Sequence, residues 1–499
     1  MTVHSLSRLR TALIIITIFS ILFPLSGCGI IIINDMSAEN VSNPETEENI
    51  SEEESAYIPK EYTPYEPKAD HHAEAEKLLA GLPERDYDGA VFFITTPVTD
   101  YIDPDTTETN VTRQIAERNR IIEDQYNISL ITSLTDARTI LTEMENAVLS
   151  DTYYTDLLMT PVYMTGQFCM ADVLMNLRSL PFLDLDAPYF NSESADMTSA
   201  GYKTYGIAGD ATLSPSAYTA LFFNRDLVKE AGMDMPYSLV TAGTWTWEKL
   251  FEYTAAVTEL NGQRENPVYI MGSQNNASRF ADLVFTSCGN TYIASARKRV
   301  PRVSFTAVSA QYAVETAHTL ITGGSSLIDA EQNAVGTFTE GDMLFLAEYL
   351  YVMPWMTNAS ADWGVLPLPK AKEENSYRTL ISNNELIFSV PLNHTQGEFA
   401  AIILSALNAG SYRYLYDEYV EHNMIHVLRD NDSVNMLELV LTTAAFDFAL
   451  AFGNGYPNIA AGTHGLIRES ALTNDLTERF TEALKTTSAV LNEEFRLTY

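Results

Sequence analysis

Cysteine is scarce in this chain, with three residues in 499, at positions 28, 169 and 288. So few cysteines exclude the disulfide framework that staples small secreted domains. If Cys28 is modified, as argued below, Cys169 and Cys288 could pair or stay reduced. Burial as single apolar residues is the better expectation, because free cysteine is among the most buried residue types.

Basic residues are also few, 30 Lys and Arg against 66 Asp and Glu, which gives a formal charge of −36. This excess of negative charge argues against nucleic acid and anionic lipid surfaces as partners. Hydrophobic residues make up 46% of the chain, which is enough for packed cores, and 499 residues exceed one ordinary core. We therefore expect two domains or lobes with an acidic surface that serves solubility.

Motifs that carry chemistry are missing from the sequence. The stretch TGGSS (322–326) lacks the lysine of a phosphate-binding loop, and there is no Gly-x-Ser-x-Gly nucleophile elbow. His422 and His426 share a helix face without the glutamate of a zinc-protease helix, and DND (430–432) lacks the glycine of a calcium loop. We therefore expect no enzyme activity, no cofactor and no metal. A pair of carboxylates for glycoside cleavage stays open, because their separation is invisible in a sequence.

The first 33 residues have the form of an export signal. Arg8 and Arg10 precede an apolar run, and LSGC (25–28) resembles the bacterial lipobox. We expect a signal peptide over 1–28 and a lipid on Cys28, which anchors the protein at the extracellular face of the cell membrane. The alternative is an uncleaved helix over 11–33, 23 residues or about 34 Å long, which would export the same domain.

The next stretch is acidic and rich in proline. After the signal there is no Lys or Arg before Lys60, whereas Glu recurs, and Pro59, Pro64 and Pro67 follow. Such a composition cannot bury enough apolar surface to fold. We expect a disordered tether over 29–85.

Strands and helices alternate after the tether. Short apolar runs predict strands over 89–96, 127–131 and 155–160. Apolar residues at spacings of four, seven and four predict a helix over about 111–126, and a second helix is expected over about 135–150. This order indicates an α/β sheet with crossover helices, whose ligands lie at the carboxyl ends of the strands.

The middle of the chain is more helical. Thr246 has the position of an N-cap for a helix that runs to about Leu260, and a second helix is expected near 308–321. A strand over 342–348 then leads into an aromatic-rich stretch, 349–355.

Two stretches in this middle region resemble a known family. ALFFNRDL (220–227) and GTWTWE (243–248) resemble extracellular solute-binding proteins of family 1, whose version is an apolar strand with Tyr-Asn-Lys-Asp-Leu-Leu and then Thr-Trp-Glu-Glu. That family supplies the capture components of bacterial ATP-binding cassette importers for sugars, and the maltose-binding protein belongs to it. Here Phe223 replaces the tyrosine and Arg225 the lysine.

Two later stretches resemble further parts of the same family. FTEGDMLF (338–345) resembles its Phe-x-x-Gly-x-x-Ala-Met strand, and DWGVLPLPK (362–370) resembles its return to the first lobe, so the resemblance covers roughly 87–499 in order and spacing. It implies an α/β, two-lobe periplasmic-binding-protein-like fold (type II), with hinge-linked lobes and a ligand cleft. The implied boundaries are 86–221 plus 368–411 for lobe one and 222–367 plus 412–499 for lobe two.

Sugar recognition needs aromatic faces for the ring and short polar groups for the hydroxyls. The resemblance implies a stacking aromatic after strand 342–348, which favours Tyr349, Tyr351 and Trp355, with plain packing as the competing role. Packing is the expected role of Trp245 and Trp363. The candidate ligand-binding residues are Glu348, Tyr349, Tyr351, Trp355, Thr96, Asp100, Thr160, Tyr163, Asp210, Asn383 and Asn384.

Each of the other candidates also has an ordinary role as an alternative. Glu348 could accept sugar hydroxyls, bind a cationic solute or face solvent. Asp210 and the lobe-one strand ends could serve in turns. Basic residues are scarce near the expected cleft, so an anionic solute is the weaker expectation.

The resemblance implies a binding function without chemistry. The protein is expected to capture a carbohydrate or similar polar solute and deliver it to an importer permease, as a monomer held at the membrane by its lipid. Two alternatives stay open: an anchored extracellular glycoside hydrolase, and a two-lobe sensor or adhesion protein.

Overall fold

A computed structural model describes residues 71–104, 109–212, 215–297, 299–329 and 331–495. The expected signal peptide, Cys28 and most of the expected tether lie outside the described residues. Within the described ranges, none of the helices combines the length and the apolar character needed to cross a bilayer.

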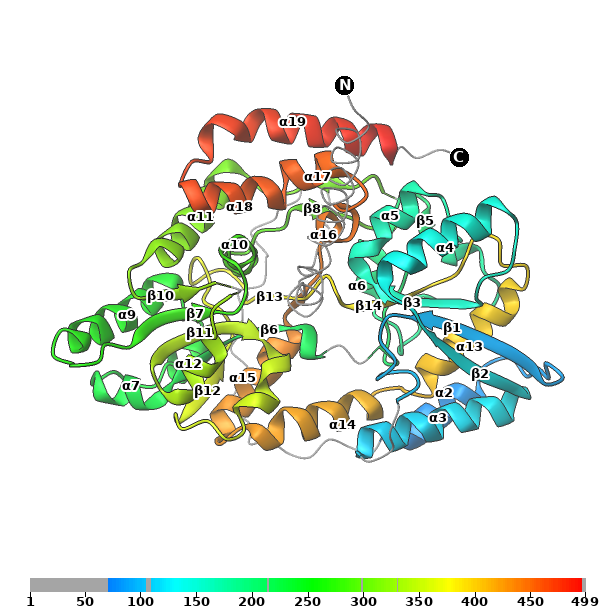
Figure 1. The fold of residues 1–499 in the computed structure, drawn as a ribbon, viewed down its shortest axis with the longest axis horizontal. Coiled ribbons are helices and arrows are strands. Elements are labelled where there is room, and N and C mark those ends of the chain that lie inside the picture. The colour runs from blue at the N-terminus through cyan, green and yellow to red at the C-terminus, as the bar shows by residue number, and fades with distance from the viewer. Residues whose placement is uncertain (1–70, 105–108, 213–214, 298, 330, 496–499) are drawn as a thin grey trace, which may run out of the picture.

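Lobe one is the unit built around a four-stranded sheet with the order β14-β3-β1-β2 (Figure 1). Its strands are β1 (Ala90–Thr96), β2 (Ile128–Leu134), β3 (Leu157–Pro161) and β14 (Leu386–Ser389). β1 is parallel to β2 and β3, and β14 is antiparallel to β3. The three strands expected near 89–96, 127–131 and 155–160 are thus confirmed. The central strands β1 and β3 are largely buried, whereas β2 is an edge strand with Ile128 as its one buried residue.

Helices α3 (Asn110–Tyr126), α4 (Ala137–Leu149) and α13 (Gly397–Ala409) belong to the same lobe. The first two confirm the helices expected between the strands. Helix α2 (His72–Ala80) lies in the stretch expected to be tether, so the folded chain begins earlier than predicted. Ala75 and Leu79 of α2 are buried, and α2 packs on α13, a partner that the sequence alone does not reveal.

Lobe two is the unit built around a five-stranded sheet with the order β10-β7-β11-β6-β12. Its strands are β6 (Thr219–Asn224), β7 (Tyr269–Ser273), β10 (Ser326–Ile328), β11 (Met343–Tyr349) and β12 (Trp363–Leu366). β11 is parallel to β7 and antiparallel to β6. All seven residues of β11 are buried, which confirms the strand expected over 342–348.

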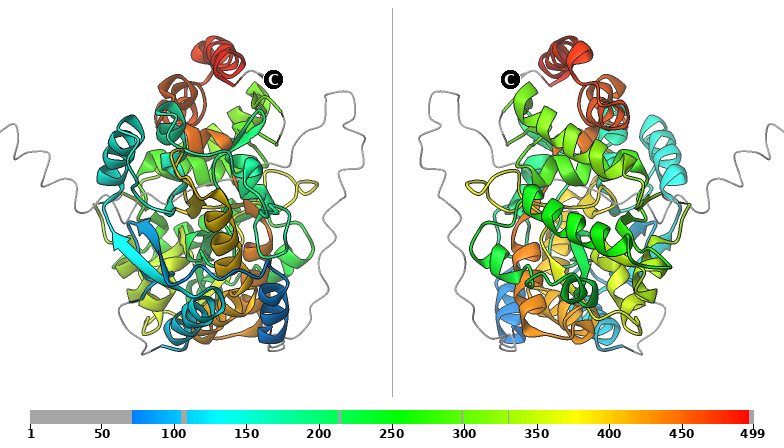
Figure 2. Two further views of the ribbon diagram at one scale, coloured as in Figure 1. Left: turned by 90° about the vertical axis from the view of Figure 1, so that its right-hand side faces the viewer. Right: turned by 90° about the vertical axis from the view of Figure 1, so that its left-hand side faces the viewer.

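The helices of lobe two include α9 (Trp247–Asn261), α10 (Ala277–Ser287) and α11 (Ala307–Thr322), followed near the C-terminus by α18 (His464–Thr473) and α19 (Thr477–Glu494). The Thr246 side chain caps α9 by accepting the N–H of Lys249, as predicted. Trp245 is completely buried and Trp363 is 1% exposed, so their expected packing role is confirmed. Figure 2 shows α18 and α19, in red, at the top of both side views.

Among the described residues, the lobes also touch outside their two main sheets, and these contacts include the following three. Helix α14 (Tyr414–Asn423) packs on α3 of lobe one, where Leu415 joins Val111 and Ile115 in a small buried cluster. The loop after β8 (Ile293–Ala294) carries Arg297, which pairs with Asp186 at 2.8 Å and with Asp196 at 2.6 Å in lobe one. Helix α5 (Thr165–Met170), which follows β3, meets α16 (Phe448–Phe452). The residue-level lobe boundaries at 221, 368 and 411 stay predictions.

Both described cysteines are free thiols. Cys288 is 6% exposed, which confirms the expected burial, whereas Cys169 is half-buried. Burial raises the pKa of the Cys169 thiol.

The contact between α5 and α16 leaves no room for a side chain at Gly166. A Cβ on Gly166 would overlap the backbone carbonyl oxygen of Phe452. We expect Gly166→Ala to destabilise the protein by about 1–3 kcal/mol, the usual cost of overpacking. Urea unfolding followed by circular dichroism measures the change.

Gly324→Ala is the matched control, since a Cβ there meets open space, and it should lie within about 0.5 kcal/mol of the wild type. Equal stabilities for the two variants would show that the α5–α16 contact is looser than the structure indicates.

Candidate functional site

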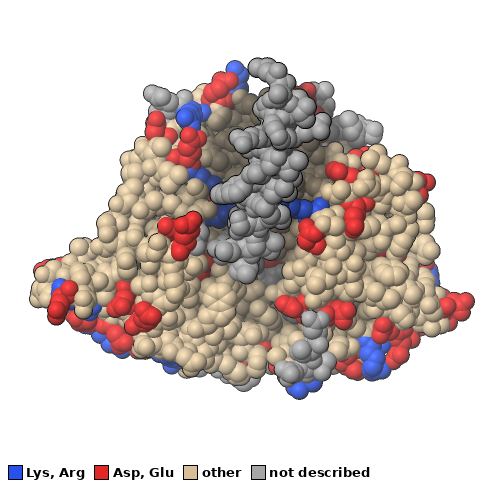
Figure 3. Space-filling model, in the orientation of Figure 1, with Lys and Arg blue, Asp and Glu red and all other residues tan. Residues whose placement is uncertain are grey.

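The carboxyl ends of parallel strands meet at one edge of a sheet, and each lobe has such an edge. In lobe one, β1 and β3 end at this edge, and in lobe two β7 and β11 do. Most of the residues predicted to bind ligand lie in the last two residues of β1, β3 or β11 or within a few residues after these strands. Figure 3 shows a face of the molecule that is hollowed between the two lobes.

Tyr349, Tyr351 and Trp355 form a short aromatic ladder after β11. Tyr349 stacks on Tyr351 with ring centroids 6.1 Å apart, and Tyr351 meets Trp355 edge-on at 5.3 Å. Tyr349 is 1% exposed, Tyr351 is half-buried and Trp355 is 60% exposed. The ladder therefore runs from the core to the surface, so Tyr351 and Trp355 can reach a solute, whereas Tyr349 supports them from behind.

The Glu348 carboxylate is occupied inside lobe two. It accepts the backbone N–H of Gln274 at 2.9 Å, that of Tyr349 at 2.9 Å and the side-chain amide of Asn275 at 3.1 Å. Burial raises the pKa of Glu348 to about 7, although all three donors act to lower it. Glu348 thus joins the end of β7 to the end of β11, and neither carboxylate oxygen is left to solvent.

The lobe-one candidates after β3 lie next to the predicted asparagines. Thr160 is 1% exposed within β3, and Tyr163, two residues past the strand, is half-buried. The backbone N–H of Tyr163 donates to the carbonyl of Asn383 at 2.9 Å. The N–H of Asn384 donates to the hydroxyl of Ser382 at 3.1 Å. Tyr163, Asn383 and Asn384 are therefore neighbours.

Two backbone segments, 217–219 and 379–385, connect this group to the aromatic ladder; together they are the joint. On the lobe-two side, Thr219 pairs with Tyr349, and its hydroxyl donates to the Leu380 carbonyl at 3.0 Å. Across the joint, the N–H of Ser382 donates to the Ala217 carbonyl at 2.9 Å. The same segment then reaches Asn383 beside Tyr163, so the candidate groups of the two lobes flank one joint.

The remaining candidates lie apart from this arrangement or are used in turns. Thr96 is completely buried, and its hydroxyl donates to the Val98 carbonyl at 2.9 Å, which is a turn role. Asp100 is exposed. Asp210 accepts the N–H of Arg413 at 2.9 Å just before α14, and burial raises its pKa to about 7.

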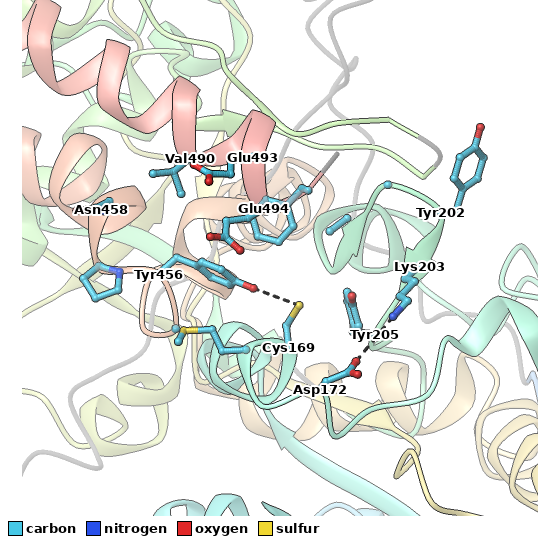
Figure 4. Close-up of a pocket in the computed structure, with 16 residues that line it drawn as sticks. Cys169, Asp172, Tyr202, Lys203, Tyr205, Tyr456, Asn458, Val490, Glu493 and Glu494 are labelled. Atoms are coloured by element: carbon cyan, nitrogen blue, oxygen red, sulfur yellow. Dashed lines mark hydrogen bonds and ion pairs between the residues drawn. The ribbon is translucent and has the colours of Figure 1, made fainter. Parts of the chain in front are cut away.

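A separate cavity of about 690 Å³ lies between lobe one and the C-terminal helices (Figure 4). Its wall is aromatic and acidic, with Tyr205, Tyr456, Phe495 and Glu494 among the lining residues. The hydroxyl of Tyr456 lies 3.6 Å from the sulfur of Cys169. None of the predicted ligand-binding residues lines this cavity.

Sequence reasoning missed several polar and charged residues at the start of α10 and on α18. Gln274 and Asn275 follow β7, and Arg279 stands in the first turn of α10. The apolar run that becomes β7 could have been recognised as a strand, and the strand-end rule would then have pointed to these residues. Arg468 of α18 carries no such local signal, because only the packing of α18 on α10 brings it there.

Comparison with solved structures identifies the fold. A cyclic alpha-maltosyl-1,6-maltose binding protein from Arthrobacter globiformis aligns at 14% identity and a TM-score of 0.56, covering 82% of this chain and 100% of its own. UgpB from Mycobacterium tuberculosis, in complex with glycerophosphocholine, aligns at 14% identity and 0.53, covering 81% and 99%.

A third structure, an ABC substrate-binding protein from Listeria monocytogenes in complex with cycloalternan, aligns at 14% identity and a TM-score of 0.51, covering 82% of this chain and 100% of its own. No protein-family model matches the sequence, and no curated protein is similar to it. At such low identity the likeness shows the fold alone. The predicted α/β two-lobe fold of importer substrate-binding proteins is therefore confirmed for this chain.

Proposed function

We propose that this protein captures a carbohydrate or similar polar solute between its two lobes and delivers it to a membrane permease. One observation carries the proposal: the joint lies between the aromatic ladder of lobe two and the Tyr163–Asn383 group of lobe one. A solute that contacts both groups favours the closed arrangement by its differential affinity for it. The Arthrobacter and Listeria proteins of the same fold, named for a cyclic maltose derivative and in complex with cycloalternan, support a sugar.

The proposal places the protein outside the cell, as a monomer anchored through a lipid on Cys28. Export is supported by the sequence of the first 28 residues, which has the form of a signal peptide ending in a lipobox. Metabolic labelling with a radioactive fatty acid tests the anchor: wild type should be labelled and Cys28→Ser should not.

Tryptophan fluorescence can test capture, because Trp355 is the exposed one of the four tryptophans. Titration with a panel of oligosaccharides should give a saturable change, and chromatography of the mixture should return the sugar intact. Cleaved sugar would support the hydrolase alternative instead. No change in fluorescence with any sugar of the panel would contradict sugar capture and favour the sensor or adhesion alternative.

The aromatic ladder should supply part of the affinity. We expect Tyr351→Ala to weaken binding by on the order of 1–3 kcal/mol, because a sugar or other ring would lose its stacking surface. Isothermal titration calorimetry measures the change. Tyr269→Ala is the matched control, since Tyr269 is 38% exposed at the amino end of β7, the opposite edge of the same sheet. Equal affinities of Tyr351→Ala and Tyr269→Ala would show that the ladder does not contact the solute.

Glu348 has the raised pKa of a general acid but the contacts of a structural group. Folded protein holds its proton up to about pH 7, and unfolded protein releases it near pH 4.5. The protonated form therefore stabilises the fold at low pH, and this contribution is lost as the pH rises through 7. Relative to Glu348→Gln, the free energy of unfolding of wild type should fall by roughly 1–3 kcal/mol between those pH values.

Chemical denaturation at a series of pH values measures this difference. Parallel pH curves for wild type and Glu348→Gln would show that the carboxyl titrates normally. The structural role further requires that wild-type protein leaves the bound sugar uncleaved at every pH.

A further inference from the structure

Residues 295–297 follow β8 in lobe two and lie against lobe one; we call them the latch. The Ser295 hydroxyl lies 3.0 Å from the carbonyl oxygen of Asp196, in α6 (Ser192–Met197) of lobe one, and 2.9 Å from that of Ser199, so both carbonyls share its one proton. Ser295 is 3% exposed and Ser199 is completely buried. Water therefore competes little for this bond.

Arg297, the last residue of the latch, adds an ion pair to the same contact. Its Nε donates to the Asp196 carboxylate at 2.6 Å, and its backbone N–H donates to the same oxygen at 3.3 Å. A second guanidinium nitrogen pairs with Asp186 at 2.8 Å. The side chain of Arg297 is 24% exposed, whereas that of Asp186 is 68% exposed. Salt therefore screens this part of the latch, above all the pair with Asp186.

Two backbone amides of lobe one, in the short hairpin 199–204 and just after it, report on different bonds. The N–H of Gly201, in the turn of the hairpin, donates to the carbonyl of Arg299 in lobe two at 3.1 Å. The N–H of Tyr205 donates to the carbonyl of Thr198 at 3.2 Å, inside lobe one. Loss of the contact between the lobes frees the first amide and leaves the second one bonded.

The bonds of Ser295, Arg297 and Gly201 all run from one lobe to the other, and none of them involves the joint. When the lobes separate at this contact, the bonds must break, and water then satisfies the same donors and acceptors. Such bonds contribute only a modest free energy, because each is exchanged for one with water. They can therefore break and re-form in the folded protein, unlike the close backbone contact at Gly166.

We propose that the latch holds the two lobes in their closed arrangement, and that latch engagement and solute capture strengthen each other. The latch bonds form only while the lobes touch, and a captured solute also requires contact with both lobes. Two events that favour the same state are coupled, and the coupling is reciprocal. The second half of this inference rests on the proposed function, whereas the first half can be measured without any solute.

Hydrogen exchange of single amides, followed by NMR of the isotope-labelled full chain without solute, tests the latch. Weakening the latch should speed exchange of the Gly201 N–H and leave that of Tyr205 unchanged. We expect about 3- to 10-fold faster exchange at Gly201 in Ser295→Ala and about 10-fold in Arg297→Gln, because each variant removes bonds between the lobes. Raising sodium chloride from about 0.05 to about 0.5 M should speed exchange at Gly201, relative to Tyr205, in wild type and not in Arg297→Gln.

Arg302→Gln is the matched control. Arg302 is exposed on β9 (Arg302–Val303), a few residues after the latch, and β9 pairs with β8. This variant removes one positive charge from the same part of lobe two and should leave exchange at both Gly201 and Tyr205 unchanged. Thermal unfolding checks that each variant is folded.

A saturating sugar from the fluorescence panel tests the coupling. Wild type with bound sugar should show exchange at Gly201 that is about 5-fold slower or more, with no change at Tyr205. Faster exchange at Gly201 on binding would show that the latch holds an open arrangement, which would overturn the proposal.

The other failures are distinguishable. Unchanged exchange at Gly201 in both latch variants, or equal acceleration at Gly201 and Tyr205, would show that the latch does not hold the lobes and would overturn the proposal. Bound sugar without effect on Gly201 would overturn the coupling. If no sugar binds, the proposed function fails, and exchange in the two latch variants still decides whether the latch holds the lobes.

Discussion

Backbone hydrogen bonds between residues 217–219 and 379–385 connect the two sheets of this protein at the joint. The segments are short, and they are bonded to each other and to the ends of β3 and β11. Because these bonds involve the main chain, the positions of Tyr163 and Tyr349 relative to the joint are set by topology rather than by flexible side chains. Any motion of one lobe against the other then acts directly on the space between these residues.

Contacts away from the joint restrain that motion. Arg297 ties the loop after β8 to Asp186 and Asp196 of lobe one, and Gly166 lets the backbone of α5 approach α16 closely. Exposed ion pairs contribute little to stability and can exchange partners, whereas a glycine contact tolerates no intruding side chain. The lobes are thus joined firmly on one side and by replaceable polar contacts on another, which suits a cleft that must open and close.

Sequence patterns revealed the parts of the fold that depend on local chemistry. The apolar run of β1, the Thr246 cap of α9 and the burial of Trp245 all follow from neighbouring residues, and the structure confirms them. The features that the sequence did not reveal depend on contacts between residues far apart in the chain. Arg468 and Asp282 lie 186 positions apart and meet only because α18 packs on α10, and α2 folds only because α13 covers it. The sequence allowed candidate site residues to be named at the ends of strands. It did not reveal which of these residues, such as Thr96, form turn hydrogen bonds instead.

Closure of the two lobes on a solute is the central claim, and an inter-lobe distance tests it most directly. Leu149 on α4 and Val308 on α11 are 86% and 83% exposed and lie on opposite lobes, so cysteines placed there, with the native cysteines replaced by serine, can carry spin labels. Pulsed electron–electron double resonance should give a shorter and narrower distance distribution when a binding solute saturates the protein than when the solute is absent. Identical distributions under saturable binding would contradict closure and leave a rigid binding protein in its place.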